Sequence, residues 1–332
     1  MMLLSQESGC LGCHLLSIAA TKREFQGRIC MRVSFHTYPP GWPWLNGWRR
    51  RNRDKHQKKY IAGRAFRSAL DADGVTTHAR ERNKPSPDDV AVIWGWKQSR
   101  LHNQMLADKK FVIILELGFI QPRNQWVSIA VNGFNGRGHF APASDNGARW
   151  EKHFSHHLKP WREGDDGYAL VIGQVPGDAA LHGQNVAAWA KSTTAELIRL
   201  GHRVVYRPHP KGPTPCPPGA ELSSRSLEED FAGAARVVVY NSTTAVESVL
   251  AGIPTVVMDI GSVAYPMASH ALDAPLVRPD RTRWCHDMAW RQWTLEELAN
   301  GTAWNHVKQL LPTTFSEHLP SKRTPWIKVF NT

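Results

Sequence analysis

The chain has 332 residues, of which 42% are hydrophobic and 21% are charged, a composition typical of folded globular proteins rather than disordered ones. The length is sufficient for two α/β domains of ordinary size, each with its own core. No apolar run reaches the about 18 residues that a membrane-spanning helix needs, so we expect no membrane span. The formal net charge of +12 favours an anionic partner or substrate.

The first thirty residues carry three of the five cysteines, and the stretch CLGCH at 10–14 has the spacing of a haem-attachment motif. Covalent haem attachment needs export, but residues 1–24 lack a basic stretch ahead of their apolar patch, so we expect no haem. We interpret residues 1–30 as a poorly ordered extension. The remaining Cys216 and Cys285 are too few for a disulfide framework, which indicates a reducing cytoplasm.

Short β-branched or apolar runs in the first half of the chain predict strands at residues 32–36, 75–78, 90–94 and 111–115. Apolar residues recur at helical spacing from Ile61 to Leu70, and Gly74 supplies a helix stop. Strands that alternate with helices are typical of a doubly wound α/β fold. Residues 31–146 are therefore predicted to form a Rossmann-like domain.

A turn-rich loop and a basic run follow the first predicted strand. The run at 49–59 holds seven Lys or Arg among eleven residues. Its cations could neutralise phosphates while the loop's rings stack on an exposed base, although solvated basic helix faces are common. We therefore expect this segment to bind an acceptor substrate that carries phosphates and bases. The residues are Trp42, Trp44, Trp48, Arg49, Arg50, Arg51 and Arg53.

The second half resumes the α/β rhythm after a connection at 147–166, which contains three histidines but no acidic or thiol ligand at a recognised metal spacing. Strands are predicted at 169–172, 203–206, 236–240 and 255–258. Helices are predicted at 184–200, after a capping box at 226–229, and at 243–251. We assign residues 167–312 to a C-terminal domain, which we expect to bind a nucleotide-sugar for the reasons given next. The tail at 313–332 is expected to pack back on the N-terminal domain.

Three of these strands end in turns suited to holding a polar ligand, and ligands of open parallel sheets bind beyond the carboxyl ends of the strands. Unpaired N–H groups and hydroxyls at 241–244 suit a phosphate, although this segment also fits an ordinary helix N-cap. A permanent cation and a histidine on a rigid Pro-framed turn suit a phosphate as well. The sequence thus predicts a nucleotide-sugar site with these donor-binding residues: Gln174, Arg207, His209, Asn241, Ser242, Thr243, Thr244 and Glu247.

Two carboxylates at strand ends complete the predicted site. Asp178 follows the strand at 169–172, and Glu116 ends the strand at 111–115 in the other domain. Facing each other across a cleft, they could serve as nucleophile and acid/base in glycosyl chemistry. Asp71 and Asp73 have the D-x-D form of some metal-dependent sugar sites, but we interpret them as the end of a helix before Gly74.

The order of four motifs resembles the retaining β-Kdo transferases of capsule synthesis, which are GT-B enzymes that use a CMP-sugar. The motifs are LELGFI at 115–120, GQVPGD at 173–178, YRPHP at 206–210, and NS…E…GIP at 241–254. They correspond to the family's E-D-G-F, Q-V-x-x-D, K-P-H-P and S-x-x-x-x-E…G-x-P types, with departures at Leu117 and Arg207. The whole chain is also similar to glycosyltransferase-like proteins of bacteriophages.

The resemblance implies a GT-B-like α/β fold of two Rossmann-type doubly wound domains that face a cleft, without a metal or another cofactor. It further implies that Asp178 is the nucleophile, that Glu116 is the acid/base, and that His209, Ser242 and Thr243 bind the donor phosphate. Three functions stay open at this point. The chain could glycosylate a hydroxymethylated pyrimidine of phage DNA, glycosylate a saccharide, or bind nucleic acid on a transferase fold without catalysis.

Overall fold

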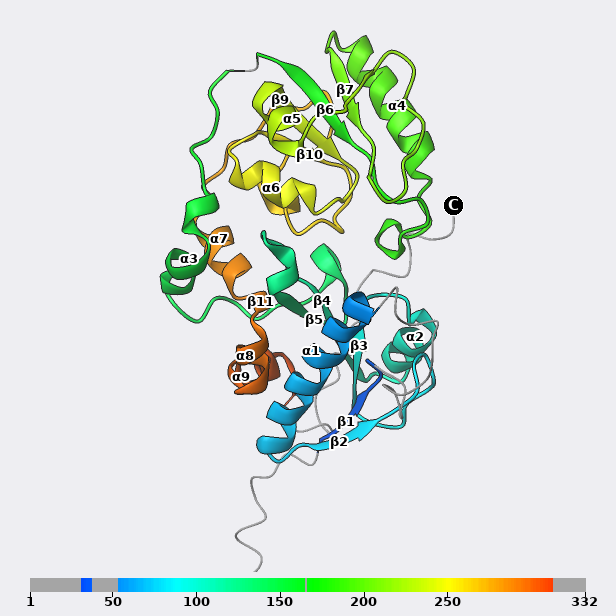
Figure 1. Cartoon of the computed structure of the whole chain (residues 1–332), viewed down its shortest axis with the longest axis vertical. Coiled ribbons are helices and arrows are strands. Elements are labelled where there is room, and N and C mark those ends of the chain that lie inside the picture. The colour runs from blue at the N-terminus through cyan, green and yellow to red at the C-terminus, as the bar shows by residue number, and fades with distance from the viewer. Residues whose placement is uncertain (1–30, 38–52, 165, 313–332) are drawn as a thin grey trace, which may run out of the picture.

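A computed structural model describes residues 31–37, 53–164 and 166–312, with only the backbone described for 53–56. The chain forms two α/β lobes, one above the other in Figure 1, and each lobe surrounds its own sheet. The expected extension at 1–30 and the tail at 313–332 lie outside the described residues. So do these predicted acceptor residues: Trp42, Trp44, Trp48, Arg49, Arg50 and Arg51. The side chain of Arg53, the first residue of α1, is likewise not described.

The first lobe is built on a sheet that, within the described ranges, has the strand order β11-β5-β4-β3-β1-β2. Strands β1 to β4 run parallel, whereas β5 is antiparallel to β4. The strands are β1 (Arg32–Phe35), β2 (Thr76–Ala79), β3 (Val90–Trp94), β4 (Phe111–Leu117), β5 (Val127–Val131) and β11 (Gln292–Trp293). The helices are α1 (Arg53–Ala72) and α2 (Ser99–Ala107), with short turns η2 (Arg123–Gln125) and η3 (Asn135–Arg137).

Alternation along β3 explains why this sheet is covered on both faces. Val90 and Val92 pack in one buried cluster with Phe66 of α1, whereas Ala91 and Ile93 pack in another with helix α2. Successive strand residues point to opposite faces, so an uninterrupted apolar run requires a helix on each side. The sequence prediction of a doubly wound first half is confirmed.

The second lobe has the strand order β10-β9-β6-β7-β8, and its paired strands are all parallel. The strands are β6 (Tyr168–Ile172), β7 (Val204–Arg207), β8 (Glu221–Leu222), β9 (Ala234–Val239) and β10 (Thr255–Val257). The helices and short turns are α3 (Ala148–His153), η4 (Ser155–His157), η5 (Ala179–Leu181), α4 (Val186–Arg199), α5 (Leu227–Gly233), α6 (Thr244–Leu250), η6 (Tyr265–Met267) and α7 (Thr282–Ala289). The predicted capping box opens α5, where the Ser226 hydroxyl accepts the Glu229 N–H and the Glu229 carboxylate accepts the Ser226 N–H.

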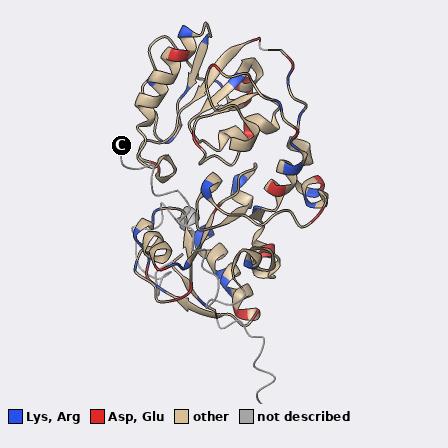
Figure 2. Cartoon of the chain, turned by 180° about the vertical axis from the view of Figure 1, so that it is seen from behind, with Lys and Arg blue, Asp and Glu red and all other residues tan. Residues whose placement is uncertain are grey.

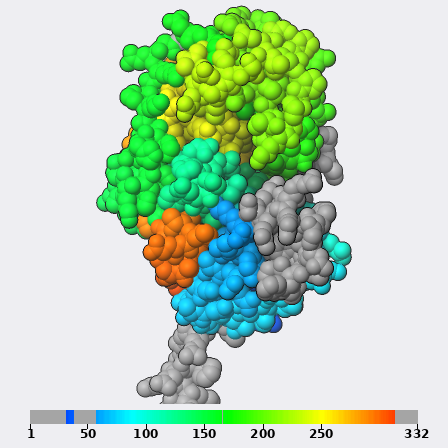
Figure 3. Space-filling view, viewed as in Figure 1, coloured from blue at the N-terminus to red at the C-terminus, as the bar shows by residue number. Residues whose placement is uncertain are grey.

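The chain returns to the first lobe after α7. Trp293 of β11 pairs with Val127 of β5, and α8 (Leu295–Ala299), α9 (Thr302–Val307) and η7 (Lys308–Leu310) follow, with α8 and α9 beside α1. Figure 3 shows these orange segments next to the blue of α1. Arg149 stabilises the segment that returns to the first lobe. Its guanidinium forms an ion pair with Glu297 and lies 4.7 Å from the Trp293 ring centroid. The return therefore begins before the boundary at 312 that the sequence suggested.

The D-x-D stretch lies at the end of α1, as predicted. Asp73 Oδ2 accepts hydrogen bonds from Trp304 Nε1 at 2.7 Å and from Lys308 Nζ at 3.0 Å, so this carboxylate fastens the returning helices to α1. Gly74 follows with a positive φ of 77°, which glycine adopts without strain. In the part of the chain that is described, no helix combines the length and the apolar character needed to cross a membrane.

Candidate active site

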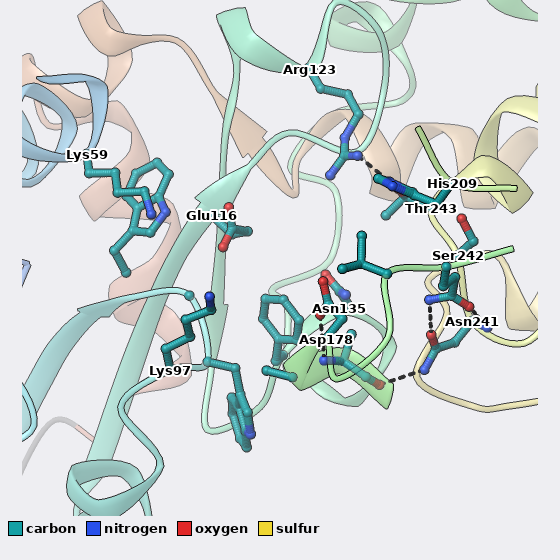
Figure 4. Close-up of a pocket in the computed structure, with 18 of the residues that line it drawn as sticks. Lys59, Lys97, Glu116, Arg123, Asn135, Asp178, His209, Asn241, Ser242 and Thr243 are labelled. Atoms are coloured by element: carbon teal, nitrogen blue, oxygen red, sulfur yellow. Dashed lines mark hydrogen bonds between the residues drawn. The ribbon is translucent and has the colours of Figure 1, made fainter. Parts of the chain in front are cut away.

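A cavity of about 290 Å³ opens between the two lobes, at the carboxyl ends of strands from both sheets. Seven of the residues singled out from the sequence line it: Glu116, Gln174, Asp178, His209, Asn241, Ser242 and Thr243. Figure 4 shows Glu116 from the first lobe and Asp178, His209 and Ser242 from the second around one space. Parallel strands deliver these loops to one edge of each sheet, and the two edges face each other. The structure thus brings both predicted carboxylates into the same cavity.

Glu116 lies near the end of β4, with β3 and β5 paired on either side. One carboxylate oxygen accepts the Leu117 N–H at 3.0 Å. Burial raises the pKa of Glu116 above its ordinary value; the Leu117 hydrogen bond and the charges of Lys59 and Arg123 oppose this rise, and the charge of Asp178 adds to it. A carboxyl with a raised pKa is a stronger base than an ordinary one, which suits proton transfer near neutral pH.

Gly95, in the loop after β3, gives the Glu116 carboxylate its space. A Cβ added at this position would lie 2.8 Å from Glu116 Oε2, and the backbone φ of 62° is unfavourable for residues with a side chain. Glycine is therefore required here by both the backbone and the neighbouring carboxylate.

Asp178 lies in the turn after β6, at the start of η5. Its Oδ1 accepts the Ala180 N–H at 2.9 Å, and its other oxygen makes no hydrogen bond within the described ranges. Asp178 is exposed and lines the cavity. One oxygen fixes the carboxylate while the other is available to a ligand, which is the geometry that a nucleophile needs.

His209 follows β7 on the Pro-framed turn. Its Nδ1 accepts the Lys211 N–H at 3.1 Å, so the neutral ring carries its proton on Nε2. Burial lowers the pKa of His209, the charge of Lys211 lowers it further, and the charge of Asp178 opposes this. The neutral imidazole can therefore donate a hydrogen bond from Nε2 into the cavity.

Gln174 and Asn241 hold the strand-end loops together rather than presenting free amides. Gln174 Nε2 donates to Asn241 Oδ1 at 2.9 Å, and the Asn241 N–H donates to Gln174 Oε1 at 3.1 Å. Asn241 Nδ2 also donates to Ala180 O at 2.7 Å and to Asp259 Oδ2 at 2.8 Å. Although both line the cavity, these side chains position the turns that carry Asp178 and Ser242.

The remaining donor-binding predictions lie in different places. Thr244 Oγ1 accepts a hydrogen bond from the Ser242 hydroxyl at 3.1 Å, and Glu247 Oε1 accepts one from Gln121 Nε2 at 3.3 Å. Neither Thr244 nor Glu247 lines the cavity. Thr243 lines it and accepts a hydrogen bond from Arg123 Nη1 at 2.9 Å.

Arg207 does not line the cavity. Its guanidinium donates to the fully buried Asp230 at 2.8 Å and to Arg225 O at 2.6 Å, inside the second lobe. The strand end was correctly located, but the side chain leaves β7 toward this carboxylate instead of the ligand space.

The lining residues that were not identified from the sequence as site residues include Lys59, Arg82, Trp96, Lys97 and Arg123. Trp96 and Lys97 directly follow β3, so the strand-end rule could have found them. The Trp96 ring is packed against His102 at a centroid distance of 4.0 Å and against His182 of the second lobe at 6.0 Å. Among the described residues, no group of three or more His, Cys, Asp or Glu could hold a metal ion.

No protein-family model matches the chain, and no curated protein is significantly similar to it. A similar solved structure is the β-Kdo 2,7 transferase of KpsC from Thermosulfurimonas dismutans, with 14% identity, 83% of this chain and 99% of that chain covered, and a TM-score of 0.47. The β-Kdo 2,4 transferase of the same KpsC has 12% identity, covers 68% and 86%, and has a TM-score of 0.41. The spinosyn rhamnosyltransferase SpnG with its aglycone has 12% identity, covers 82% and 91%, and has a TM-score of 0.27.

These values assign neither a family nor an activity. The fold class follows from the chain itself: two doubly wound α/β domains with mostly parallel sheets face a cleft, the GT-B-like arrangement expected from the sequence.

Proposed function

We propose that this chain is a glycosyltransferase that moves a sugar from a nucleotide-sugar donor to an acceptor hydroxyl. The observation that carries the proposal is the meeting of Glu116 and Asp178, from different lobes, in one cavity with His209, Ser242 and Thr243. A donor phosphate would accept hydrogen bonds from His209 Nε2, from the Thr243 hydroxyl, and from the Ser242 hydroxyl once it turns away from Thr244 Oγ1, to which it donates at 3.1 Å in the structure. Thr243 Oγ1 already accepts from Arg123, so its own proton is available for donation.

The proposed reaction is a double displacement. The Asp178 carboxylate attacks the anomeric carbon, the bond from that carbon to the phosphate oxygen breaks, and the nucleotide leaves with the electron pair. The acceptor oxygen then attacks the same carbon, its proton passes to the Glu116 carboxylate, and Asp178 is released as a carboxylate. The raised pKa of Glu116 favours this proton transfer. No metal or other cofactor takes part in the proposed scheme.

For the acceptor, we propose a hydroxymethylated pyrimidine in DNA. The net charge of +12 and the cations that line the first-lobe side of the cavity (Lys59, Arg82 and Lys97) support a polyanion, and the Trp96 ring offers a stacking surface. The resemblance to bacteriophage proteins agrees with this acceptor, and such an enzyme would act in the cytoplasm of an infected bacterium. The Trp- and Arg-rich segment that was predicted to contact DNA lies outside the described residues.

A saccharide acceptor is the second candidate, and the distribution of charge favours it. Figure 2 shows Lys and Arg positions of the described residues in both lobes. A duplex-binding protein commonly concentrates its cations in a patch or stripe. A saccharide with acidic groups would need only the few cations that line the cavity.

The test is mass spectrometry of DNA nucleosides from cells that produce this chain together with a pyrimidine-hydroxymethylating system. A nucleoside heavier by one sugar, absent with Glu116→Gln, supports the DNA acceptor. If the nucleosides are unchanged while the purified protein still transfers sugar from CMP-, UDP- or GDP-sugars to an oligosaccharide, the acceptor is a saccharide. If no donor is consumed with any acceptor, the proposed enzymatic function is wrong.

A further inference from the structure

Arg123 reaches from the first lobe to the second across the cavity. It lies in η2, in the loop after β4, and its Nε donates to Gly118 O of its own lobe at 2.6 Å. Its Nη1 donates to Thr243 Oγ1 of the second lobe at 2.9 Å. Figure 4 shows the guanidinium between Glu116 and Thr243, at the edge of the cavity that His209 and Ser242 also border. The guanidinium group is thus held in place by one hydrogen bond to each lobe, through Nε and Nη1.

This guanidinium still has unused donor capacity. It carries five N–H bonds, and two of them are accounted for by Gly118 and Thr243. Its Nη2 makes no hydrogen bond to any residue in the described ranges. A half-buried Arg with a fixed fork and unoccupied N–H groups is well suited to take two oxygens of a phosphate.

Two carboxylates flank Arg123 but do not occupy its donors. The charges of Glu116 and Glu247 both act on it, and Glu247 is instead hydrogen-bonded by Gln121 Nε2 at 3.3 Å. The cation that the sequence suggested for the phosphate, Arg207, is committed to Asp230. Arg123 is therefore a permanent positive charge directly beside the Ser242–Thr243 turn.

We propose that Arg123 binds the phosphate of the nucleotide donor from the first lobe, while its bonds to Gly118 and Thr243 keep the two lobes in register around that phosphate. This inference rests on the proposed function, because it assigns a ligand to the same cavity. When the bond to the sugar breaks, negative charge develops on the phosphate, and a fixed guanidinium stabilises it without further rearrangement.

The competing explanation is that Arg123 only balances the charge of Glu247 or Glu116 and has no ligand. The two explanations differ in what an additional Glu247→Gln substitution does. If Arg123 is only a counter-ion, removal of the opposing carboxylate restores both the stability and the nucleotide affinity that Arg123→Gln loses. If it binds phosphate, removal of the carboxylate restores the charge balance but not the affinity for phosphate.

The first experiment is calorimetric titration of the purified chain with CMP, UDP and GDP, and with cytidine, uridine and guanosine as the matched ligands without phosphate. For the nucleotide that binds, Arg123→Gln should weaken affinity by about 10- to 100-fold, the effect of a charge-assisted hydrogen-bond pair. Arg123→Lys, which keeps the charge but loses the fork, should give a smaller loss. Nucleoside affinity should not change. Arg100→Gln, at an exposed position of α2 outside the cavity, is the control and should behave as the parent.

The second experiment compares Glu247→Gln with the double variant Arg123→Gln/Glu247→Gln. The double variant should bind the nucleotide about 10- to 100-fold more weakly than Glu247→Gln. It should also unfold at a somewhat lower temperature, because the hydrogen bonds of Arg123 to Gly118 and Thr243 are lost. Recovery of affinity together with stability would overturn the inference, as would equal nucleotide affinity in Arg123→Gln and the parent.

These outcomes separate the inference from the function on which it rests. Nucleotide binding that depends on Arg123, without transfer of sugar to any acceptor, would keep the inference and refute the transferase. Normal nucleotide binding and normal transfer by Arg123→Gln would do the reverse. A parent protein that binds none of the three nucleotides would contradict both.

Discussion

Arg137 and Asp259 join the two lobes by a two-point ion pair, with 2.8 Å between Nη1 and Oδ2 and 2.7 Å between Nη2 and Oδ1. Asp259 Oδ2 also accepts a hydrogen bond from Asn241, whose amide is paired with Gln174. Beside this pair, the Gly136 N–H donates to Gly261 O at 2.9 Å. The contact between the lobes therefore continues directly into the loops that carry the candidate site.

Breaking this pair should destabilise the protein in a pH-dependent way. Burial raises the pKa of Asp259, but the hydrogen bonds and charge of Arg137 outweigh it, so the pKa lies below its usual range. Arg137→Met should lower the free energy of unfolding near neutral pH by about 1–3 kcal/mol. The difference from the parent should shrink as pH falls through the pKa of Asp259, because the pair's stabilisation is lost there.

Urea unfolding at several pH values measures this difference, and Arg199→Met is the matched control. Arg199 pairs with Glu196 on the exposed surface of α4, with side-chain exposures of 68% and 39%, so its loss should change stability little. Equal effects of the two substitutions would show that the pair between the lobes is not important for stability.

Gly95→Ala should disturb both the backbone and the Glu116 carboxylate. The positive φ alone should reduce stability by about 1 kcal/mol, and the added Cβ must displace Glu116 Oε2. Gly74→Ala is the control, since its φ is 77° but nothing lies within 4 Å of the added Cβ. Both variants should lose stability in thermal unfolding, but only Gly95→Ala should shift the pH dependence of turnover. An unshifted profile would mean that Glu116 does not set it.

Glu116→Gln should be more stable than the parent, and increasingly so at higher pH. The native state holds Glu116 at a pKa above its ordinary value of 4.5, so the parent loses stability as pH rises from that value toward the native pKa. Glutamine cannot ionise and can still accept the Leu117 N–H. Urea unfolding should therefore give similar stabilities near about pH 4 and a more stable variant near about pH 8. A variant that is less stable near about pH 8 would refute the raised pKa.

His209→Ala and Ser242→Ala should each weaken nucleotide-sugar binding by about 1–3 kcal/mol without unfolding the protein. Each substitution removes one donor that we assign to the phosphate. Calorimetric titration with CMP-, UDP- and GDP-sugars measures the loss. Ser192→Ala on α4 is the control, because its hydroxyl bonds to Trp189 O, away from the cavity. Unchanged affinity in both site variants would place the donor elsewhere.

The strand-end turns could be predicted because buried parallel strands require continuous β-branched runs, and β6, β7, β9 and β10 all lie within two residues of their predicted positions. Helix α2 was not predicted, because only two apolar residues of its nine, Leu101 and Met105, are buried. The strand β5 was missed as well. Its run is apolar but interrupted by Ser128, whose hydroxyl is bonded to Leu117 O.

Side-chain direction was harder to predict than position. The sequence placed Arg207 at the correct strand end, but nothing local indicates that a buried Asp230 takes its guanidinium. Arg123 contacts Thr243 across 120 residues and between two lobes, and no spacing rule connects such a pair. The return of the chain through β11 was missed for the same reason, since Trp293 and its partner Val127 are distant in sequence.

In the proposed mechanism, Asp178 forms a covalent bond to the sugar and Glu116 assists its release to the acceptor. Asp178→Asn and Glu116→Gln should keep donor affinity and each lose at least about a hundredfold in turnover. They should differ in the intermediate, because only the second step needs Glu116.

The most direct measurement is mass spectrometry of Glu116→Gln after incubation with nucleotide-sugar donors. The proposed double displacement predicts a protein heavier by one sugar residue, with the addition on the peptide that contains Asp178, and no addition with Asp178→Asn. Transfer at the normal rate by Asp178→Asn, with no addition to either variant, would contradict it.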